Sequence, residues 1–146
     1  MKILFTIIVV ALTFLNISAQ DKRFTHNYEN GFMWVDFDKR VIPKNVKYDF
    51  LSSMLENEKL KKITGNYKDD LGCSNDLNKL QSIGVQIDLI EIVKMIDDFY
   101  LNEYNMIIPI RYAYCYCIKT LVDRNSEELD LYRSKIIYFS ESSLEK

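Results

Sequence analysis

The residues of this chain whose types could do chemistry are few, and their spacing does not suit catalysis. The single histidine, His26, lies in a polar stretch near the N-terminus, where we expect a solvated side chain rather than a base. Asp97 and Asp98 are adjacent, so on a helix their side chains would point about 100° apart and would not share one substrate. The chain also lacks the motifs of phosphate-binding loops, zinc proteases, serine hydrolases and dinucleotide-binding folds. The sequence therefore predicts no catalytic residue. It favours a binding protein over the alternative, a small secreted or periplasmic hydrolase whose site no known motif marks.

The N-terminus predicts export. Lys2 precedes an apolar run from residue 3 to residue 15, and the small Ala19 ends a region suited to cleavage, so residues 1–19 are interpreted as a signal peptide. The run is shorter than the roughly 20 apolar residues of a membrane-spanning helix, although an uncleaved N-terminal anchor is the alternative. No later segment is long and apolar enough to span a bilayer. The expected location is the periplasm or the extracellular space.

The charge balance argues against nucleic acid as a partner. The net charge is −2, and residues 1–19 hold one Lys and no acid, so their removal gives −3. The basic cluster Lys59, Lys61 and Lys62 falls near a predicted helix end, where cations complement the helix dipole. Proteins that bind nucleic acid carry larger basic patches. We therefore expect a protein or another envelope component as the partner.

Three cysteines offer disulfide chemistry, because an exported protein meets an oxidising compartment. Cys115 and Cys117 are two residues apart on a predicted helix, so their side chains diverge by about 200° and should not bridge each other. A bridge from Cys73 to either Cys117 or Cys115 would tie a polar loop to that helix and leave one thiol over. Three unpaired cysteines are the alternative. Cys-x-Cys with one distant cysteine lacks the spacing of a structural zinc site, so we predict no metal and no cofactor.

Apolar residues at helical spacing predict two helices on either side of a polar corner. From residue 89 to residue 100 apolar side chains recur at i, i+3, i+4 and i+7, and Asp88 precedes them as a capping residue. A second helix is predicted from about residue 109 to residue 124, with Pro109 in its first turn, where a missing N–H costs nothing. Since the corner has only about six residues, the two helices should pack on each other as an αα-hairpin.

The side chains at this corner have a predicted structural role. We expect Asp97, Asn102 and Asn105 to hold the reversal by hydrogen bonds to backbone groups that lack helical partners. Phe99 should pack between the two helices, and Pro109 should open the second one. These five residues form the predicted structural corner.

The alternative interpretation makes part of the corner a binding site. The candidate ligand-binding residues are then Tyr100, Asn105, Trp34 and Tyr112. Trp34, the only tryptophan, is interpreted as an anchor for the N-terminal segment or as a rim residue of a binding groove. Tyr112 shares its helix with two further tyrosines, and three tyrosines at these positions should not all face the core. An exposed aromatic patch would suggest a protein or glycan partner.

The remaining pattern predicts an all-α single domain over residues 20–146. Further helices are expected at 43–63, opened by Pro43, at 75–82, and after Asn125, which forms a capping box with Glu128. Residues 20–30 are polar and expected to be loosely ordered. The domain would then consist of about four helices around the central αα-hairpin.

Three segments resemble a pattern found in a family of small exported bacterial proteins of unknown function. The family pattern is NG-x-x-W, then K-x-x-Y-x-x-G-F-x-x-G, then LD-x-FY-x-D-x-x-N-x-x-IPV-x-x-A. The first matches residues 30–34, the second residues 47–57 and the third residues 97–113. The chain departs from the second segment, with Phe50 for Tyr, Ser53 for the first Gly and Asn57 for the second. The resemblance implies a helical exported protein and transfers no activity. Together with the absent catalytic motifs, it favours a binding or interaction protein of the bacterial envelope, of which an immunity-type protein that blocks a toxin is one version.

Export makes the first testable prediction. The intact mass of the protein recovered from the producing cells should lack residues 1–19, because the signal peptide is removed after Ala19. Recovery of the full-length chain from the cytosol would contradict the predicted location.

Overall fold

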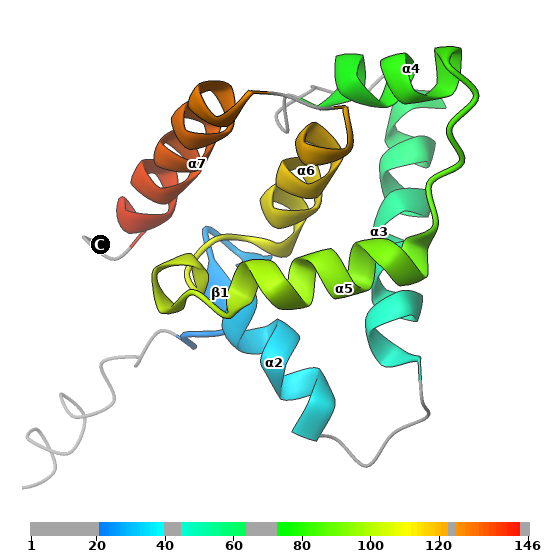
Figure 1. Ribbon diagram of the computed structural model, residues 1–146. Helices are drawn as coiled ribbons and strands as arrows, with labels where there is room; N and C mark the ends of the chain where they lie inside the picture. The colour runs from blue at the N-terminus through cyan, green and yellow to red at the C-terminus, as the bar shows by residue number, and fades with distance from the viewer. Residues whose placement is uncertain (1–20, 40–44, 64–72, 123–124, 144–146) are drawn as a thin grey trace, which may run out of the picture.

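The computed structural model describes residues 21–39, 45–63, 73–122 and 125–143. The described helices are α2 (Gly31–Lys39), α3 (Val46–Ile63), α4 (Ser74–Ser82), α5 (Leu89–Tyr100), the short 3-10 helix η1 (Glu103–Asn105), α6 (Ile110–Leu121) and α7 (Ser126–Glu141). Two short strands, β1 (Phe24–Thr25) and β2 (Tyr28–Glu29), pair in antiparallel register. Figure 1 shows α6 near the centre, with α7 on one side, α3 and α4 on the other, and α5 and α2 below.

The predicted all-α class is confirmed, since the described chain is mostly helical with little strand. The predicted helices at 75–82 and 89–100 and the helix after Asn125 correspond to α4, α5 and α7. Asp88 and Asn125 cap their helices, accepting from Ile90 N at 2.8 Å and from Glu128 N at 2.8 Å. The signal peptide and the helix start at Pro43 lie outside the described residues. No helix of the described part is long and apolar enough to cross a membrane.

The described part has six α-helices, against the predicted total of about four. Five of them lie where the sequence analysis expected a helix, and the sixth, α2, was not expected. Asn30 stands before this helix, and its side-chain Oδ1 accepts from Phe32 N at 3.1 Å. Trp34 and Phe37 form its buried face. Residues 32–35 are apolar without a break, so the sequence of this helix shows no clear helical repeat of apolar and polar side chains. The helix therefore depends on its packing against the rest of the protein more than on a repeat of apolar residues in its sequence.

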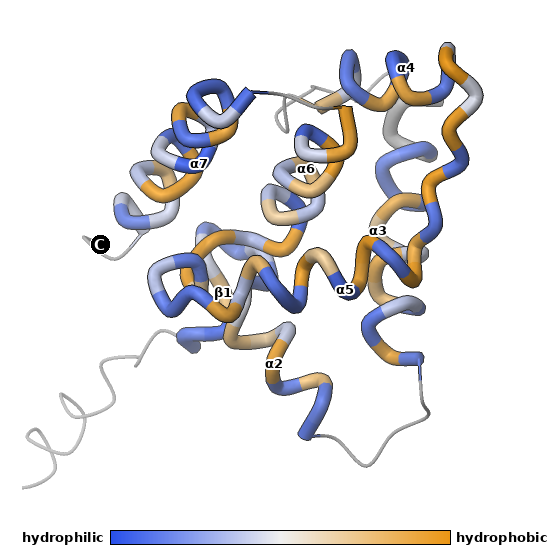
Figure 2. The backbone as a smooth tube through the Cα atoms, viewed as in Figure 1, coloured by the Kyte–Doolittle hydropathy of each residue, from blue (hydrophilic) through white to orange (hydrophobic). Residues whose placement is uncertain are grey.

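The core surrounds α6. Ala113, Cys115 and Ile118 on α6 have no exposed surface, and neither have Ile92 and Ile96 on α5. Because α6 contacts α5, α7, α4 and β2, it needs apolar side chains on most of its circumference. In Figure 2 α6 accordingly lies between other elements, while α7 at the surface mixes hydrophilic and hydrophobic residues.

This position explains the three tyrosines of α6 and corrects the expectation for them. Tyr112 and Tyr114 are buried, and Tyr116 packs partly buried against the core. The ring of Tyr112 lies 5.3 Å from that of Phe139 on α7, and the ring of Tyr116 lies 5.0 Å from that of Phe99 on α5. All three rings are therefore packed, because helices cover α6 on opposite sides.

Residues 21–30 form an ordered hairpin in place of the predicted loose segment. Thr25 and Asn30 are buried, and Asn30 Nδ2 donates to Lys22 O at 2.8 Å and to Thr25 Oγ1 at 2.9 Å. His26, predicted to be solvated, places its Nε2 2.8 Å from the backbone oxygen of Phe139, and its ring packs on that of Phe139. These contacts join the hairpin to α7, more than 100 residues away, so no local pattern predicts them.

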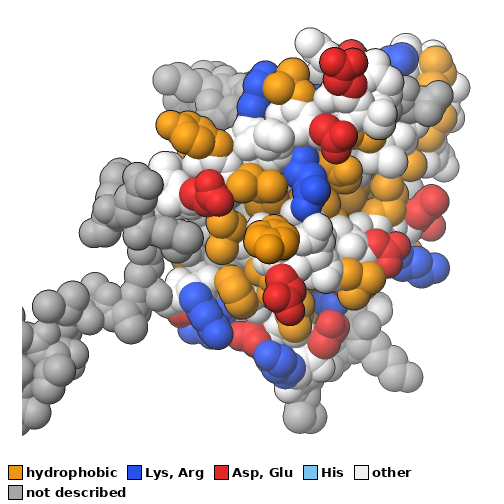
Figure 3. Space-filling view, turned by 60° about the vertical axis from the view of Figure 1, so that its left-hand side comes forward, with side chains coloured by type: hydrophobic (Ala, Val, Ile, Leu, Met, Phe, Trp, Pro, Cys, Tyr) orange, Lys and Arg blue, Asp and Glu red, His pale blue; other side chains and the backbone are white. Residues whose placement is uncertain are grey.

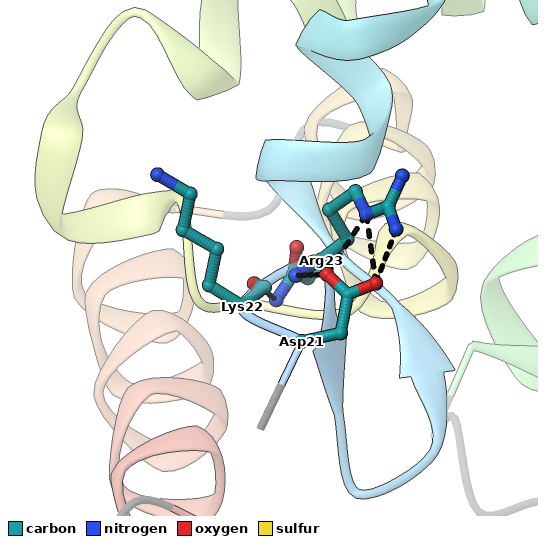
Figure 4. A network of polar contacts seen from close by, with 4 residues as sticks. Asp21, Lys22 and Arg23 are labelled. Atoms are coloured by element: carbon teal, nitrogen blue, oxygen red, sulfur yellow. Dashed lines mark hydrogen bonds and ion pairs between the residues drawn. The ribbon is translucent and has the colours of Figure 1, made fainter. Parts of the chain in front are cut away.

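An ion pair precedes the hairpin at the surface. Figure 4 shows the Arg23 guanidinium facing the Asp21 carboxylate, and Arg23 Nε lies 2.8 Å and 2.9 Å from the two carboxylate oxygens. The hydrogen bonds from Arg23 lower the pKa of Asp21 to about 2. Lys22 turns away from the pair, and its Nζ lies 5.2 Å from the centre of the Phe32 ring. Such exposed pairs stabilise a fold little.

A disulfide joins Cys73, directly before α4, to Cys115 on α6, with Cα atoms 5.5 Å apart. Cys115 was one of the two predicted partners. Cys117 is the free cysteine and is buried. The bridge links the start of α4 to the central helix, so these two elements are covalently fixed to each other.

Gly31 lies where two of the segments that carry the family resemblance approach each other closely. A Cβ atom added to Gly31 would lie 2.5 Å from Cδ1 of Tyr100 and 2.9 Å from the Cα atom of Met106. The Gly31 N–H also donates to Met106 O at 3.0 Å. Only glycine therefore allows α2 to begin against the corner.

Gly31→Ala should destabilise the protein by about 1–3 kcal/mol, because the added methyl group overpacks a site whose backbone neighbour cannot turn away. The free energy of unfolding, measured by urea denaturation, tests this. Ser134→Ala, at an exposed position of α7, is the control and should change it by less than about 0.5 kcal/mol. A Gly31→Ala variant as stable as the control would show that α2 does not depend on this contact.

Candidate functional site

The corner between α5 and α6 is built from short-range backbone bonds and two asparagines. Asn102 caps η1, its Oδ1 accepting from Tyr104 N at 3.0 Å. The Asn105 N–H donates to Asn102 O at 2.9 Å, and the Ile108 N–H donates to Asn105 O at 2.9 Å. Pro109 stands at the cap of α6 rather than in its first turn as predicted, and its carbonyl accepts from Tyr112 N at 2.9 Å. The reversal is thus held tightly by its own backbone.

Asn105 is the buried centre of the corner, with 4% of its surface exposed. Its Nδ2 donates to the Phe99 carbonyl at the end of α5 at 2.6 Å. Its Oδ1 accepts from Nε and Nη2 of Arg133 on α7, at 3.1 Å and 3.0 Å. One amide therefore satisfies a helix-end carbonyl, as predicted for a structural role, and also positions an arginine, which the sequence analysis did not foresee.

The other side of the corner is bonded to the N-terminal elements and to Tyr100 of α5. Three consecutive carbonyls accept hydrogen bonds: Met106 O from Gly31 N at 3.0 Å, Ile107 O from Thr25 Oγ1 at 2.6 Å, and Ile108 O from Tyr100 Oη at 2.8 Å. Burial raises the pKa of the Tyr100 phenol well above its usual value, so Tyr100 remains a donor. The first and third segments that carry the resemblance are thus in direct contact.

Asp97 does not hold the corner backbone, contrary to the prediction. Its Oδ1 accepts from Trp34 Nε1 at 2.7 Å and from Lys47 Nζ at 2.6 Å. Lys47 also bonds Asp38 at 2.6 Å and lies 5.2 Å from the centre of the Trp34 ring. Burial lowers the pKa of Lys47, but its hydrogen bonds to Asp38 and Asp97 outweigh burial and raise it overall. Asp97 therefore joins α5 to α2 and α3.

A groove of about 360 Å³ opens beside the corner, between α5, η1, α6 and α7. We call it the corner groove. It is lined by Met95, Asp98, Phe99, Asn102, Asn105, Tyr116, Cys117, Thr120 and Arg133. Figure 3 brings forward the side of the molecule with α7 and the corner, where apolar side chains lie among charges of both signs. The groove thus combines apolar walls with the guanidinium of Arg133 and the carboxylate of Asp98.

Cys117 in this groove is a poor nucleophile. Burial raises the pKa of its thiol to about 12, so at neutral pH the group is protonated. No group of three or more His, Cys, Asp or Glu side chains in the described part is placed to hold a metal ion.

The predicted ligand-binding candidates do not share one site. Asn105 lines the corner groove, whereas Trp34 and Tyr100 border a separate cavity of about 250 Å³ and are themselves buried. Tyr112 packs against Phe139. The residue that sequence reasoning missed is Arg133. The sequence feature that could have identified Arg133 is its position: it is a charged residue within the apolar stripe of the last helix, next to Tyr132 and three residues before Ile136.

A further cavity of about 220 Å³ lies between β2, α3 and the start of α6. Phe50, Ser53 and Asn57, at which the chain departs from the second segment of the family pattern, all line it. Arg111 also lines it and forms an ion pair with Glu58 at 3.0 Å. Ser53 and Asn57 therefore put side chains on this wall where the pattern has glycines.

The chain matches no protein-family model, no curated protein and no solved structure. The family resemblance therefore stays a prediction.

Replacing Asn105 by Ala should lower the free energy of unfolding by about 1–3 kcal/mol, because the buried Phe99 carbonyl loses its donor. Asn102→Ala removes only an exposed cap and should cost about 1 kcal/mol or less. Urea denaturation of both variants measures the difference. If Asn105→Ala is as stable as the wild type, its side chain serves binding alone and the structural role assigned to it is wrong.

Proposed function

We propose that the protein is a non-enzymatic binding protein of the bacterial envelope, and that the corner with its groove is the recognition face. The observation that carries the proposal is the exposure of two large apolar side chains on a rigid turn. Tyr104 is 81% exposed and Leu101 is 80% exposed, the highest values among large apolar side chains of the described residues. Between them, Asn102 fixes the backbone of η1.

Such a turn suits a protein partner. Large aromatic and aliphatic side chains that are exposed close together on an ordered backbone are suited to serve as anchors of a protein interface. Because the backbone is already ordered, binding would not lose the entropy of fixing it. A groove with apolar walls directly beside the turn gives the partner a cavity to fill.

The location in the envelope rests on the predicted signal peptide. An immunity-type protein, which would bind and block a toxin outside the cytoplasm, is one version of this function, and it rests on the shared class of small exported helical proteins. The hydrolase alternative needs an activated group. Cys117 is held as a thiol by burial, and Nε2 of His26 is engaged with the backbone carbonyl of Phe139 and the Ser142 hydroxyl. The observations therefore favour the binding protein.

Partner capture tests the proposal. Immobilised wild-type protein is exposed to the envelope fraction of the producing cells, and the captured protein is identified, purified and titrated back. Replacing Leu101 and Tyr104 together by Ala should weaken its binding at least about 30-fold, the effect of losing an interface anchor worth about 2 kcal/mol. The melting temperature should stay unchanged, because both side chains are exposed.

Ile83→Ala is the matched control, since Ile83 is also a large apolar side chain and is 64% exposed, but lies at the end of α4. It should leave the affinity unchanged. Equal binding by the Leu101/Tyr104 variant and the wild type would overturn the corner as the recognition face.

A further inference from the structure

Arg133 in the corner groove differs from the other described arginines in the partner that holds it. Its Nε and Nη2 both donate to Oδ1 of Asn105, a neutral amide, and within the described residues it forms no ion pair. A guanidinium keeps its charge at every physiological pH, so a positive charge stands in this groove without a carboxylate paired to it. The groove is also lined by the exposed carboxylate of Asp98, but among the residues that the structure describes no ion pair joins Asp98 to Arg133, so the guanidinium itself favours an anionic group of a ligand.

We propose that the corner groove binds a carboxylate attached to an apolar group, as at the C-terminus of a polypeptide that ends in an apolar residue, and that Arg133 is the residue that receives it. This inference rests on the proposed function and names the chemistry of the ligand.

The geometry of the guanidinium supports a two-point contact. Asn105 occupies the edge formed by Nε and Nη2. The opposite edge, with Nη1 and the second hydrogen of Nη2, forms no hydrogen bond within the described part of the chain. That edge has the fork shape that carboxylates bind through two parallel hydrogen bonds. Since Asn105 is itself fixed on the Phe99 carbonyl at 2.6 Å, the fork is oriented before any ligand arrives.

Arg111 provides the comparison within the same molecule. It also lines a cavity, but it forms an ion pair with Glu58 at 3.0 Å, and its guanidinium lies 4.5 Å from the centre of the Tyr28 ring. Both side chains of the pair are largely buried, at 10% and 16% exposed. The charge of Arg111 is therefore neutralised inside the fold, whereas that of Arg133 is left for a ligand.

The walls of the groove define the rest of the ligand. Met95, Phe99 and Tyr116 supply apolar and aromatic surface next to Arg133, and the rings of Phe99 and Tyr116 lie 5.0 Å apart. The volume of about 360 Å³ is in the range of small-ligand sites. Asp98 is exposed and also lines the groove, so a ligand with several negative charges would be repelled. One carboxylate on an apolar body fits Arg133 and the apolar walls, and it is repelled by Asp98 less than a ligand with several negative charges would be.

Titration of the ¹⁵N-labelled protein by nuclear magnetic resonance tests the inference with three probes. N-acetyl-phenylalanine has the carboxylate and the aromatic body, N-acetyl-phenylalaninamide has the body without the charge, and inorganic phosphate has the charge without the body. N-acetyl-phenylalanine should shift the Arg133 Nε–H and Asn105 Nδ2–H signals in a saturable way. The amide should bind at least tenfold more weakly, and phosphate should give no saturable shift.

Three variants separate the role of Arg133 from general charge. Arg133→Gln removes the cation, and Arg133→Lys keeps the charge without the fork; each should weaken N-acetyl-phenylalanine binding at least tenfold. The shifts are then read at Asn105 and at the backbone of η1. Arg111→Lys keeps the charge that pairs with Glu58 and should leave binding within twofold of the wild type.

Equal binding of the amide probe, saturable binding of phosphate, binding that survives in Arg133→Gln, or the absence of a saturable shift in the wild type would each overturn the inference. The proposed function fails separately. If the captured partner loses affinity for the Leu101/Tyr104 variant but binds Arg133→Gln as it binds the wild type, the recognition face stands and the carboxylate assignment falls.

Discussion

Three consecutive backbone carbonyls of the corner, those of Met106, Ile107 and Ile108, set the constraint on which the other contacts depend. A carbonyl that is removed from water without gaining a donor costs about 1–3 kcal/mol. The donors come from Gly31 at the start of α2, from Thr25 in the hairpin and from the Tyr100 phenol. The corner, the N-terminal hairpin and α2 must therefore assemble together, and the close fit at Gly31 follows from that requirement.

The amide of Asn105 extends the same network to the opposite side. It bonds the end of α5 through its nitrogen and the guanidinium of Arg133 on α7 through its oxygen. Because a buried amide needs donors and acceptors on the correct sides, it can face only one way, and the arginine it holds takes a fixed orientation. In this way a residue that completes the fold also lines the groove, and under the proposed function one side chain has both a structural and a recognition role.

The charged side chains around the corner and the two cavities differ in the group that each one contacts. Asp97 is shared between Trp34 and Lys47, and Glu58 neutralises Arg111, so these groups link α2, α3, α5 and α6 without offering charge to a ligand. Among the described arginines, Arg133 is the one held by an uncharged partner. Together with the exposed side chains of Leu101 and Tyr104, this places apolar surface and available positive charge around the same turn.

The sequence by itself determined the helices α4, α5 and α7 with the caps of the last two, because an apolar repeat over two or more turns and a capping side chain are local properties. It also limited a disulfide of Cys73 to two partners, Cys117 or Cys115. It identified Asn105 as a candidate for a structural or a ligand-binding role. Tertiary structure decided what depends on distant partners: the hairpin around His26, the helix α2, the bonds of Asp97 to Trp34 and Lys47 in place of the corner backbone, and the contact of Arg133 with Asn105. Arg133 and Asn105 are 28 positions apart, and a hydrogen bond over that separation produces no repeat in the sequence. Only the packed structure therefore shows this bond and the groove beside it.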